Sequence, residues 1–215
     1  MSYPIFRVSA VALLLLLIAF LPVQAAGAGA ADKYFSRAIK YMDKGDFDKA
    51  IADFTKALKI NPYLAEAYYN LGLIFGKEKH DYENAIVGLS RAVQLNPKYA
   101  EAHNSLGEVY RIGKKDYDKA VAEYSEAIKI KKDFAEAYYN RGIAFFEGKK
   151  EYDNATADYT KALEINRNFA AAYYNRAIVY MTKGDKTNGC GDIARACELG
   201  MCEYAQHVKS TGECK

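Results

Sequence analysis

The stretch AEAYYNRG at residues 135–142 decides the fold, because close copies of it recur along the chain. The copies read AEAYYNLG at 65–72, AEAHNSLG at 100–107 and AAAYYNRA at 170–177, and a more divergent copy begins at Ala31. Successive copies start 34 or 35 residues apart. A fixed period of this length indicates stacked supersecondary units, none of which can bury its apolar face alone. The sequence therefore predicts five repeats, at 31–64, 65–99, 100–134, 135–169 and 170–201, followed by a cap at 202–215.

Each repeat contains two amphipathic helical stretches joined by a turn rich in Lys, Gly and Asp. Residues 65–77 are an example of the first, and the second is expected to begin at Phe47, Tyr82, Tyr117 and Tyr152. In the first repeat, apolar residues of the second stretch fall three and four apart, which is the period of a helix that buries one face. Asn-Pro pairs at 61–62 and 96–97 end this stretch, because proline cannot continue a helix. The fold class is therefore all-α, built from antiparallel helix pairs.

A column of small residues recurs in the first helices at Gly72, Gly107 and Gly142. A helix that carries glycine at such a position lets a second helix approach closely. We expect these glycines to lie where the two helices of a repeat cross, opposite alanines of the second helix (Ala85, Ala120 and Ala155).

These positions match a known family. The residues that carry the match are Tyr68, Leu71, Gly72, Phe75, Ala85, Leu89, Ala92 and Pro97. The chain resembles the tetratricopeptide-repeat (TPR) family from residue 31 to about residue 199. The resemblance implies a right-handed superhelical solenoid, in which the first helices line a concave groove that binds extended or helical peptides. The fifth repeat departs from the pattern at Gly189 and is expected to be a terminal capping repeat, followed by a short helix at 202–208.

Carried over residue by residue, the resemblance places a peptide-binding groove on one side of the first helices. The groove residues it implies are Phe35, Tyr69, Asn70, Leu73, Asn104, Tyr139, Asn140, Ile143, Tyr174 and Asn175. An asparagine side chain offers a donor and an acceptor together, so a line of them could hold a peptide backbone. The hypothesis assigns this role to Asn70, Asn140 and Asn175, with Tyr69, Tyr139 and Tyr174 packing beside them. The alternative is that the recurring Tyr-Tyr-Asn sequence serves packing alone.

The amino terminus has the pattern of an export signal. Arg7 precedes an apolar run from Val8 to Leu21, and small residues follow Pro22. The run is short for a membrane span, which needs roughly 20 residues, and the small-residue exit favours cleavage. We expect a signal peptide at 1–25, cleaved after Ala25 or alternatively after Ala30, and a periplasmic or secreted protein. The alternative is an uncleaved membrane anchor. If the signal peptide is cleaved, the protein contacts the membrane only through that peptide, during export.

Four cysteines (Cys190, Cys197, Cys202 and Cys214) lie close to the carboxyl terminus. An even number in an exported chain favours two disulfides. Cys190 and Cys197 are seven residues apart, roughly 10 Å along one helix, which is too far to bridge. Of the two remaining pairings, we favour Cys197–Cys202 with Cys190–Cys214. A zinc site or a redox pair is the weaker alternative, because their usual short spacings are missing.

Composition and motifs exclude several functions. The net charge is +3 and charges of both signs are interspersed, so no basic face for nucleic acid is expected. No nucleophile, phosphate-loop or metalloprotease motif occurs, and His103 is expected to be a packed ring rather than a base. The sequence therefore predicts neither enzyme activity nor a metal or cofactor. We expect a monomeric adaptor of the bacterial envelope that binds a protein or peptide segment, with a self-assembling structural protein as the alternative.

Overall fold

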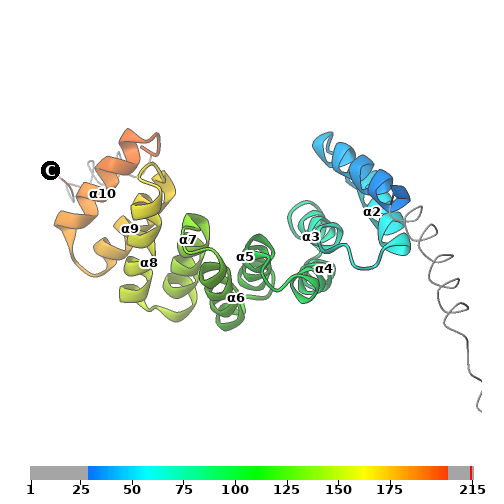
Figure 1. Ribbon diagram of the computed structural model, residues 1–215. Coiled ribbons are helices and arrows are strands. Elements are labelled where there is room, and N and C mark those ends of the chain that lie inside the picture. Colours follow the sequence, from blue (N-terminus) through cyan, green and yellow to red (C-terminus); the bar gives the residue numbers. More distant parts are fainter. Residues whose placement is uncertain (1–28, 203–213, 215) are drawn as a thin grey trace, which may run out of the picture.

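The computed structural model describes residues 29–202 and residue 214. The predicted signal peptide and most of the predicted cap, with its helix at 202–208, therefore lie outside the described residues. All regular structure in the described part is helical. Helix pairs follow one another along an arch, with α4 and α6 on its outer side (Figure 1).

The first pair consists of a helix described from residue 29 to residue 43 and α2 (Phe47–Ile60). The later pairs follow in chain order as α3 (Ala65–Leu73) with α4 (Tyr82–Leu95), α5 (Ala100–Val109) with α6 (Tyr117–Ile130), α7 (Ala135–Ala144) with α8 (Tyr152–Ile165), and α9 (Ala170–Thr182) with α10 (Lys186–Glu198). The second helices thus begin where the sequence predicts. Asn61 and Asn96 end α2 and α4 just before the prolines.

Aspartate side chains define the start of most second helices. Asp46, Asp81, Asp116 and Asp185 each accept a hydrogen bond from the backbone N–H three residues later. This contact satisfies one of the donors that a helix start leaves unpaired. Glu151 takes the same place before α8, but its longer side chain makes no such bond.

The three middle repeats end their first helices in a π-helical turn. These turns are η1 (Ile74–Glu78), η2 (Tyr110–Lys114) and η3 (Phe145–Lys149). Each is followed by a non-glycine residue with positive φ, namely His80, Lys115 or Lys150. The outer repeats are one residue shorter in this region and turn at Gly45 and Gly184 instead. The extra residue of the 35-residue repeats is therefore accommodated as a wider helical turn.

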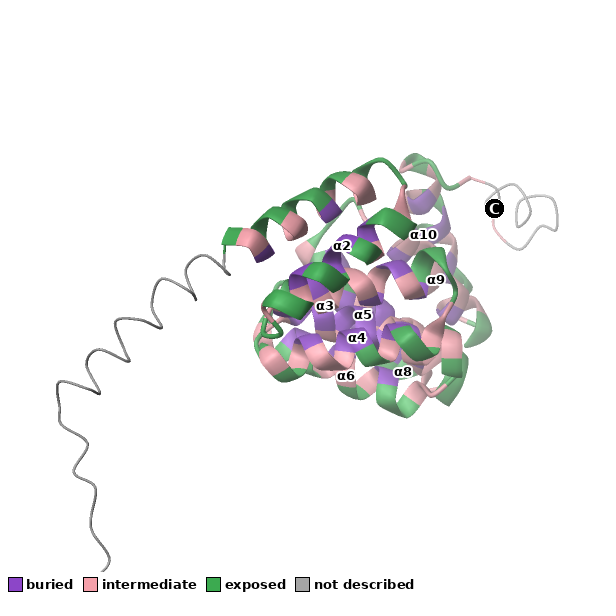
Figure 2. Ribbon diagram, turned by 90° about the vertical axis from the view of Figure 1, so that its right-hand side faces the viewer, coloured by how far each residue is buried: buried purple, intermediate pink, exposed green. Residues whose placement is uncertain are grey.

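The core lies between helices and between neighbouring pairs (Figure 2). Its largest fully buried side chains include Phe54, Leu89, Tyr124 and Tyr159, all from second helices. A Cβ placed on Gly72, Gly107 or Gly142 would lie 2.6, 2.8 or 2.7 Å from Leu89, Tyr124 or Tyr159 respectively. These glycines therefore make room mainly for a large side chain, whereas the sequence analysis expected them to face alanines.

Ion pairs join each turn to the preceding repeat. Lys79 pairs with Asp48 at 2.7 Å and Lys149 with Asp118 at 2.6 Å, and Lys114–Glu83 and Lys183–Asp153 occupy the corresponding places. These groups are largely exposed to solvent, which screens their charges, so each pair contributes little to stability. Their regular placement fixes how consecutive repeats meet along this edge.

Candidate peptide-binding surface

The predicted groove residues lie on the first helix of each repeat, but their side chains are largely engaged within the protein. Asn140 donates from Nδ2 to Oδ1 of Asn104 at 3.2 Å, and the two residues are only 8% and 4% exposed. Asn175 donates to the hydroxyl oxygen of Tyr139 at 3.0 Å. Asn70 donates to the backbone carbonyl of Glu66 in its own helix at 2.7 Å.

These contacts bear on the asparagine hypothesis. The Asn140–Asn104 bond links repeats 3 and 4, and the Asn175–Tyr139 bond links repeats 4 and 5. Asn104 and Asn140 offer too little surface for a ligand to contact them directly. The structure thus gives these asparagines a part in holding repeats together, in line with the packing alternative.

The predicted aromatic residues pack on neighbouring rings. Phe35 lies against Phe54 with ring centroids 5.5 Å apart, Tyr69 against Tyr99 at 4.8 Å, and Tyr139 against Phe169 at 4.7 Å. Burial raises the pKa values of Tyr69 and Tyr139, and it raises the pKa of Tyr99 to about 12. Tyr174 and Ile143 are also partly buried. The rings are therefore held in place, each with part of its surface accessible.

A cavity of about 270 Å³ opens between repeats 2 and 3. Leu73, the one predicted groove residue in its wall, lies opposite residues of the next repeat. The full lining comprises Gly72, Leu73, Gly76, Lys77, His80, Tyr82, Leu89, Ser105, Glu108, Val109 and Ile112. Most of this wall is apolar, and Ile112 is 47% exposed at its edge.

This cavity was not predicted from the sequence, although a glycine at one position of repeat 2 indicates it. Gly76 occupies the place where the next two repeats carry Arg111 and Phe146. Those side chains are packed: the Nε atom of Arg111 is buried, and the ring of Phe146 lies 5.8 Å from that of Tyr152. The smaller residues Gly76 and Leu89 of repeat 2 therefore leave an opening at a place where repeats 3 and 4 carry larger side chains.

One acidic side chain lies in the wall of the cavity, and others lie in the first turns of α3, α5 and α7. Lys77 and Glu108 in its wall form an ion pair at 3.5 Å, and Glu101 pairs with Lys131 at 3.3 Å. Glu66 and Glu136 lie in the first turns of α3 and α7 and form no ion pair within the described part of the chain. The first turns of α3, α5 and α7 thus present a column of carboxylates beside the Tyr69–Tyr99 ring pair.

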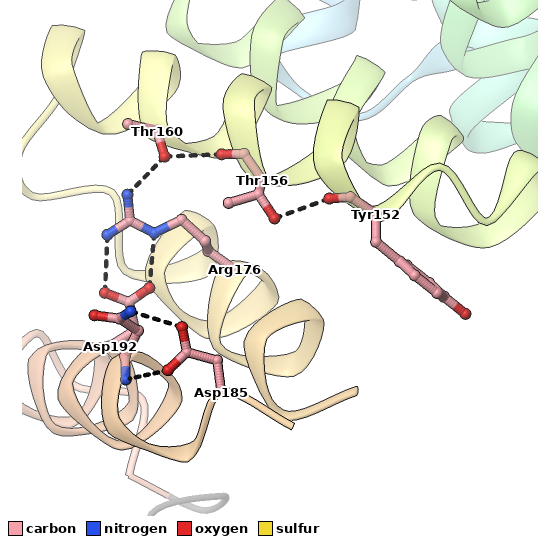
Figure 3. A network of polar contacts seen from close by, with 7 residues as sticks. Tyr152, Thr156, Thr160, Arg176, Asp185 and Asp192 are labelled. Atoms are coloured by element: carbon pink, nitrogen blue, oxygen red, sulfur yellow. Dashed lines mark hydrogen bonds and ion pairs between the residues drawn. The ribbon is translucent and has the colours of Figure 1, made fainter. Parts of the chain in front are cut away.

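Three arginines form a second set of polar contacts that the sequence analysis did not assign. Arg37, Arg141 and Arg176 each make two hydrogen bonds to an aspartate in the second helix of the same repeat, namely Asp53, Asp158 and Asp192. Arg176 also donates to Oγ1 of Thr160 in the preceding repeat (Figure 3). These partners raise the pKa of the arginines and keep them charged. The contacts are structural, because they join two or three helices and leave the aspartates almost fully buried.

The cysteines close the carboxyl-terminal end. Cys190 is bonded to Cys214 and Cys197 to Cys202, with Cα–Cα distances of 5.6 and 4.1 Å. This is the pairing that the sequence favours. Cys197 and Cys214 pack against a small core of Ala177 and Ile193. The two bonds therefore tie residues 202 and 214 to α10, the last described helix.

The part of the chain that the structure describes contains no group of three or more His, Cys, Asp or Glu side chains that could hold a metal ion. Over the same residues, no helix has the length and apolar character needed to span a bilayer. His103 lies with Nδ1 2.7 Å from Oε2 of Glu123, and this hydrogen bond raises the pKa of the imidazole.

The geometry defines an α-solenoid built from repeated helix pairs. A family model described as a TPR repeat matches residues 40–79, 77–111, 113–147 and 149–184. These matches cover more than half of the chain, so the protein belongs to the tetratricopeptide-repeat family.

Solved structures show the same architecture. The crystal structure of MamA is 28% identical, with a TM-score of 0.69, over 80% of this chain and 96% of that chain. PilF of Pseudomonas aeruginosa is 19% identical, with a TM-score of 0.76, over 87% of each chain. YrrB, described as a TPR protein with an unusual peptide-binding site, is 21% identical with a TM-score of 0.68, over 82% of this chain and 90% of that chain.

Among curated proteins, the uncharacterized protein MJ0572 of Methanocaldococcus jannaschii is 35% identical over 43 residues, which is 20% of this chain. The match spans half the length of that relative.

Proposed function

We propose that this protein is a non-catalytic adaptor that binds a segment of another protein along the inner side of its arch. The cavity between repeats 2 and 3, with the exposed Ile112 at its edge, is the observation that carries the proposal. A preformed apolar recess with a few polar groups is the usual form of a ligand site. The description of YrrB as a peptide-binding TPR protein supports the same use of this fold.

A capture experiment with matched surface variants tests the adaptor function. The mature protein is immobilised and exposed to an envelope extract of the source organism, and retained proteins are identified by mass spectrometry. Ile112→Glu places a charge at the cavity edge, whereas Val87→Glu places one on α4 at a residue that is 67% exposed and does not line the cavity. We expect a small set of proteins that wild type and Val87→Glu retain and Ile112→Glu loses.

Two other results would count against the proposal. Equal retention by all three proteins would move binding away from the inner side of the arch. No specific capture, combined with a species that grows with concentration in size-exclusion chromatography, would support a self-assembling structural protein instead of a monomeric adaptor.

We further propose that the protein acts after export, in the periplasm or outside the bacterial cell. The apolar run at 8–21, the small residues after it and the two disulfides support this location. Intact-mass measurement of the protein from the extracytoplasmic fraction should show loss of residues 1–25 or 1–30. A protein that keeps these residues would contradict a cleaved signal.

A further inference from the structure

The cavity between repeats 2 and 3 has the size and lining of a pocket for one aromatic side chain. Its volume is about 270 Å³, whereas an apolar protein cavity of about 150 Å³ suffices to bind benzene. Leu73, Leu89, Val109 and Ile112 provide apolar contacts from two repeats. An apolar ring that fills such a recess is stabilised there, because its apolar surface is removed from water.

Two positions in the cavity wall carry smaller residues in repeat 2 than in the later repeats. Repeat 2 has Gly76 where repeats 3 and 4 have Arg111 and Phe146, and it has Leu89 where they have tyrosines. Gly76 lies within the π-helical turn η1 and has no positive φ, so its backbone conformation does not require a glycine. Repeat 4 thus fills with its own phenylalanine a place that repeat 2 leaves open.

The charges around the cavity indicate what else its occupant carries. Glu66, Glu101 and Glu136 occupy equivalent first-turn positions, and only Glu101 has an ion-pair partner within the described chain. Beside them, Tyr69 and Tyr99 present a pair of rings 4.8 Å apart. Carboxylates next to aromatic faces favour a guanidinium or ammonium group.

The spacing along α3 relates the two features. Leu73 in the cavity wall lies seven residues after Glu66, which corresponds to roughly 10 Å along a helix axis. An extended peptide covers this distance in about three residues. The aromatic and basic groups of one segment could therefore reach both features.

We propose, building on the adaptor function, that the bound segment is an extended peptide with one phenylalanine and nearby basic residues. The phenylalanine ring enters the cavity between repeats 2 and 3. Arginine or lysine residues about three positions away face Glu66 and Glu136. The protein thus recognises a basic–aromatic segment.

Synthetic peptides test this inference directly. The probe is a fluorescein-labelled peptide of Gly and Ser that carries one Phe and two Arg, with the first Arg three positions from the Phe. Its matched partners replace Phe by Ser, or both Arg by Glu. Binding to the full, disulfide-bonded protein is followed by fluorescence anisotropy. We expect the probe to bind and either replacement to weaken binding at least tenfold.

Protein variants locate the bound ring and the charges. Gly76→Phe copies the residue of repeat 4 into the cavity and should weaken binding at least tenfold. Gly191→Phe makes the same change at an exposed helical glycine with open space around it and should have no effect. The double variant Glu66→Gln, Glu136→Gln should weaken binding several-fold and flatten its dependence on salt.

The outcomes separate this inference from the adaptor proposal. A Cβ at residue 76 would lie 3.3 Å from Cγ2 of Val109, so Gly76→Phe is checked by circular dichroism, and the peptide series does not depend on it. Equal affinity for the Phe and Ser peptides, or no binding of the probe, would overturn the inference. If Ile112→Glu still abolishes partner capture in that case, the adaptor function stands. If capture does not depend on Ile112, the adaptor proposal itself fails.

Discussion

The side-chain amide of Asn140 donates a hydrogen bond to the side-chain carbonyl of Asn104, 3.2 Å away across the boundary between repeats 3 and 4. Both residues are buried, so a side chain that loses this bond has little contact with solvent to compensate for it. A mid-helix asparagine is slightly unfavourable by itself. Here the contact between repeats gives the side chain of Asn140 a partner within the protein.

Asn140→Ala should therefore destabilise the protein by about 1–3 kcal/mol, because it leaves the buried carbonyl of Asn104 without this donor. Urea unfolding followed by circular dichroism measures the change. Asn70→Ala is the matched control: its amide bonds only within its own helix, and it should cost less than about 0.5 kcal/mol. Equal costs for the two variants would show that the bond between repeats contributes nothing special.

The arginine–aspartate pairs give a second prediction. Arg141→Leu leaves the carboxylate of Asp158 buried without its partner and should cost about 2–4 kcal/mol. The double variant Arg141→Leu, Asp158→Ala removes both charges and should recover more than half of that loss. Repeat 2 shows that the fold accepts an uncharged version, because it carries Leu71 and Gly88 at these positions. If the double variant is less stable than Arg141→Leu alone, the loss of stability does not come from the isolated charge of Asp158, and this explanation is wrong.

The residues with positive φ that follow the π-helical turns give a third prediction. Lys150 has φ of 53°, a conformation that costs a non-glycine residue roughly 1–2 kcal/mol. Lys150→Gly should raise the free energy of unfolding by about 0.5–1 kcal/mol, after allowance for the extra freedom of glycine in the unfolded chain. Glu78→Gly, inside η1, is the control and should lower it by a similar amount. A loss of stability in Lys150→Gly would mean that its side chain makes a contact that outweighs the strain.

The His103–Glu123 contact makes stability depend on pH. The hydrogen bond to Glu123 raises the pKa of the imidazole in the folded state above its unfolded value near 6.5. The protonated form is therefore the stabilised one: its contribution is full below the unfolded pKa and disappears as pH rises through the folded pKa. The stability difference between wild type and His103→Tyr should fall by up to about 1 kcal/mol between pH 5.5 and pH 8.5. A difference that is constant across this range would contradict a protonated His103.

Reduction of the disulfides should destabilise the carboxyl-terminal end. The chain-entropy model gives about 3.5 kcal/mol for Cys190–Cys214, whose cysteines are 24 residues apart, and about 2 kcal/mol for the shorter Cys197–Cys202. The double variants Cys190→Ala, Cys214→Ala and Cys197→Ala, Cys202→Ala separate the two, with unfolding followed by calorimetry. In the reduced protein, proteolysis should open the last repeat before the middle repeats, because it has a neighbour on only one side. Unchanged stability after complete reduction would show that packing alone holds this end.

Much of the architecture could be predicted because the repeat supplies the same information several times. The starts of the second helices at Phe47, Tyr82, Tyr117 and Tyr152 follow from the turn rich in Lys, Gly and Asp that precedes them and from the apolar period. The use of the extra residue in the middle repeats could not be predicted. A repeat of 35 residues is visible as a length, but only the backbone shows that the residue enters a π-helical turn.

The candidate site was harder to predict, because polar side chains of one type can face a ligand or a neighbouring repeat. Asn140 and Asn104 satisfy each other, and nothing in their sequence distinguishes this from a row of free amides. The cavity depends on a side chain that is absent at Gly76 and on the packing of Val109 from the next repeat. Sequence motifs describe side chains that are present, so they do not predict an opening that small residues leave.

The extra residue in the middle repeats also has an evolutionary consequence. Repeats 2, 3 and 4 share the π-helical turn and a turn lysine that pairs with an acid of the preceding repeat. A duplicated copy of residues 100–134 would therefore bring its own π-helical turn, and its turn lysine would meet Asp118 of the preceding copy as Lys149 does. The two ends, which turn at glycines and include the disulfide-bonded terminus, would stay unchanged. Such a protein can grow by whole middle units, and each added unit would lengthen its binding surface without requiring a new kind of contact.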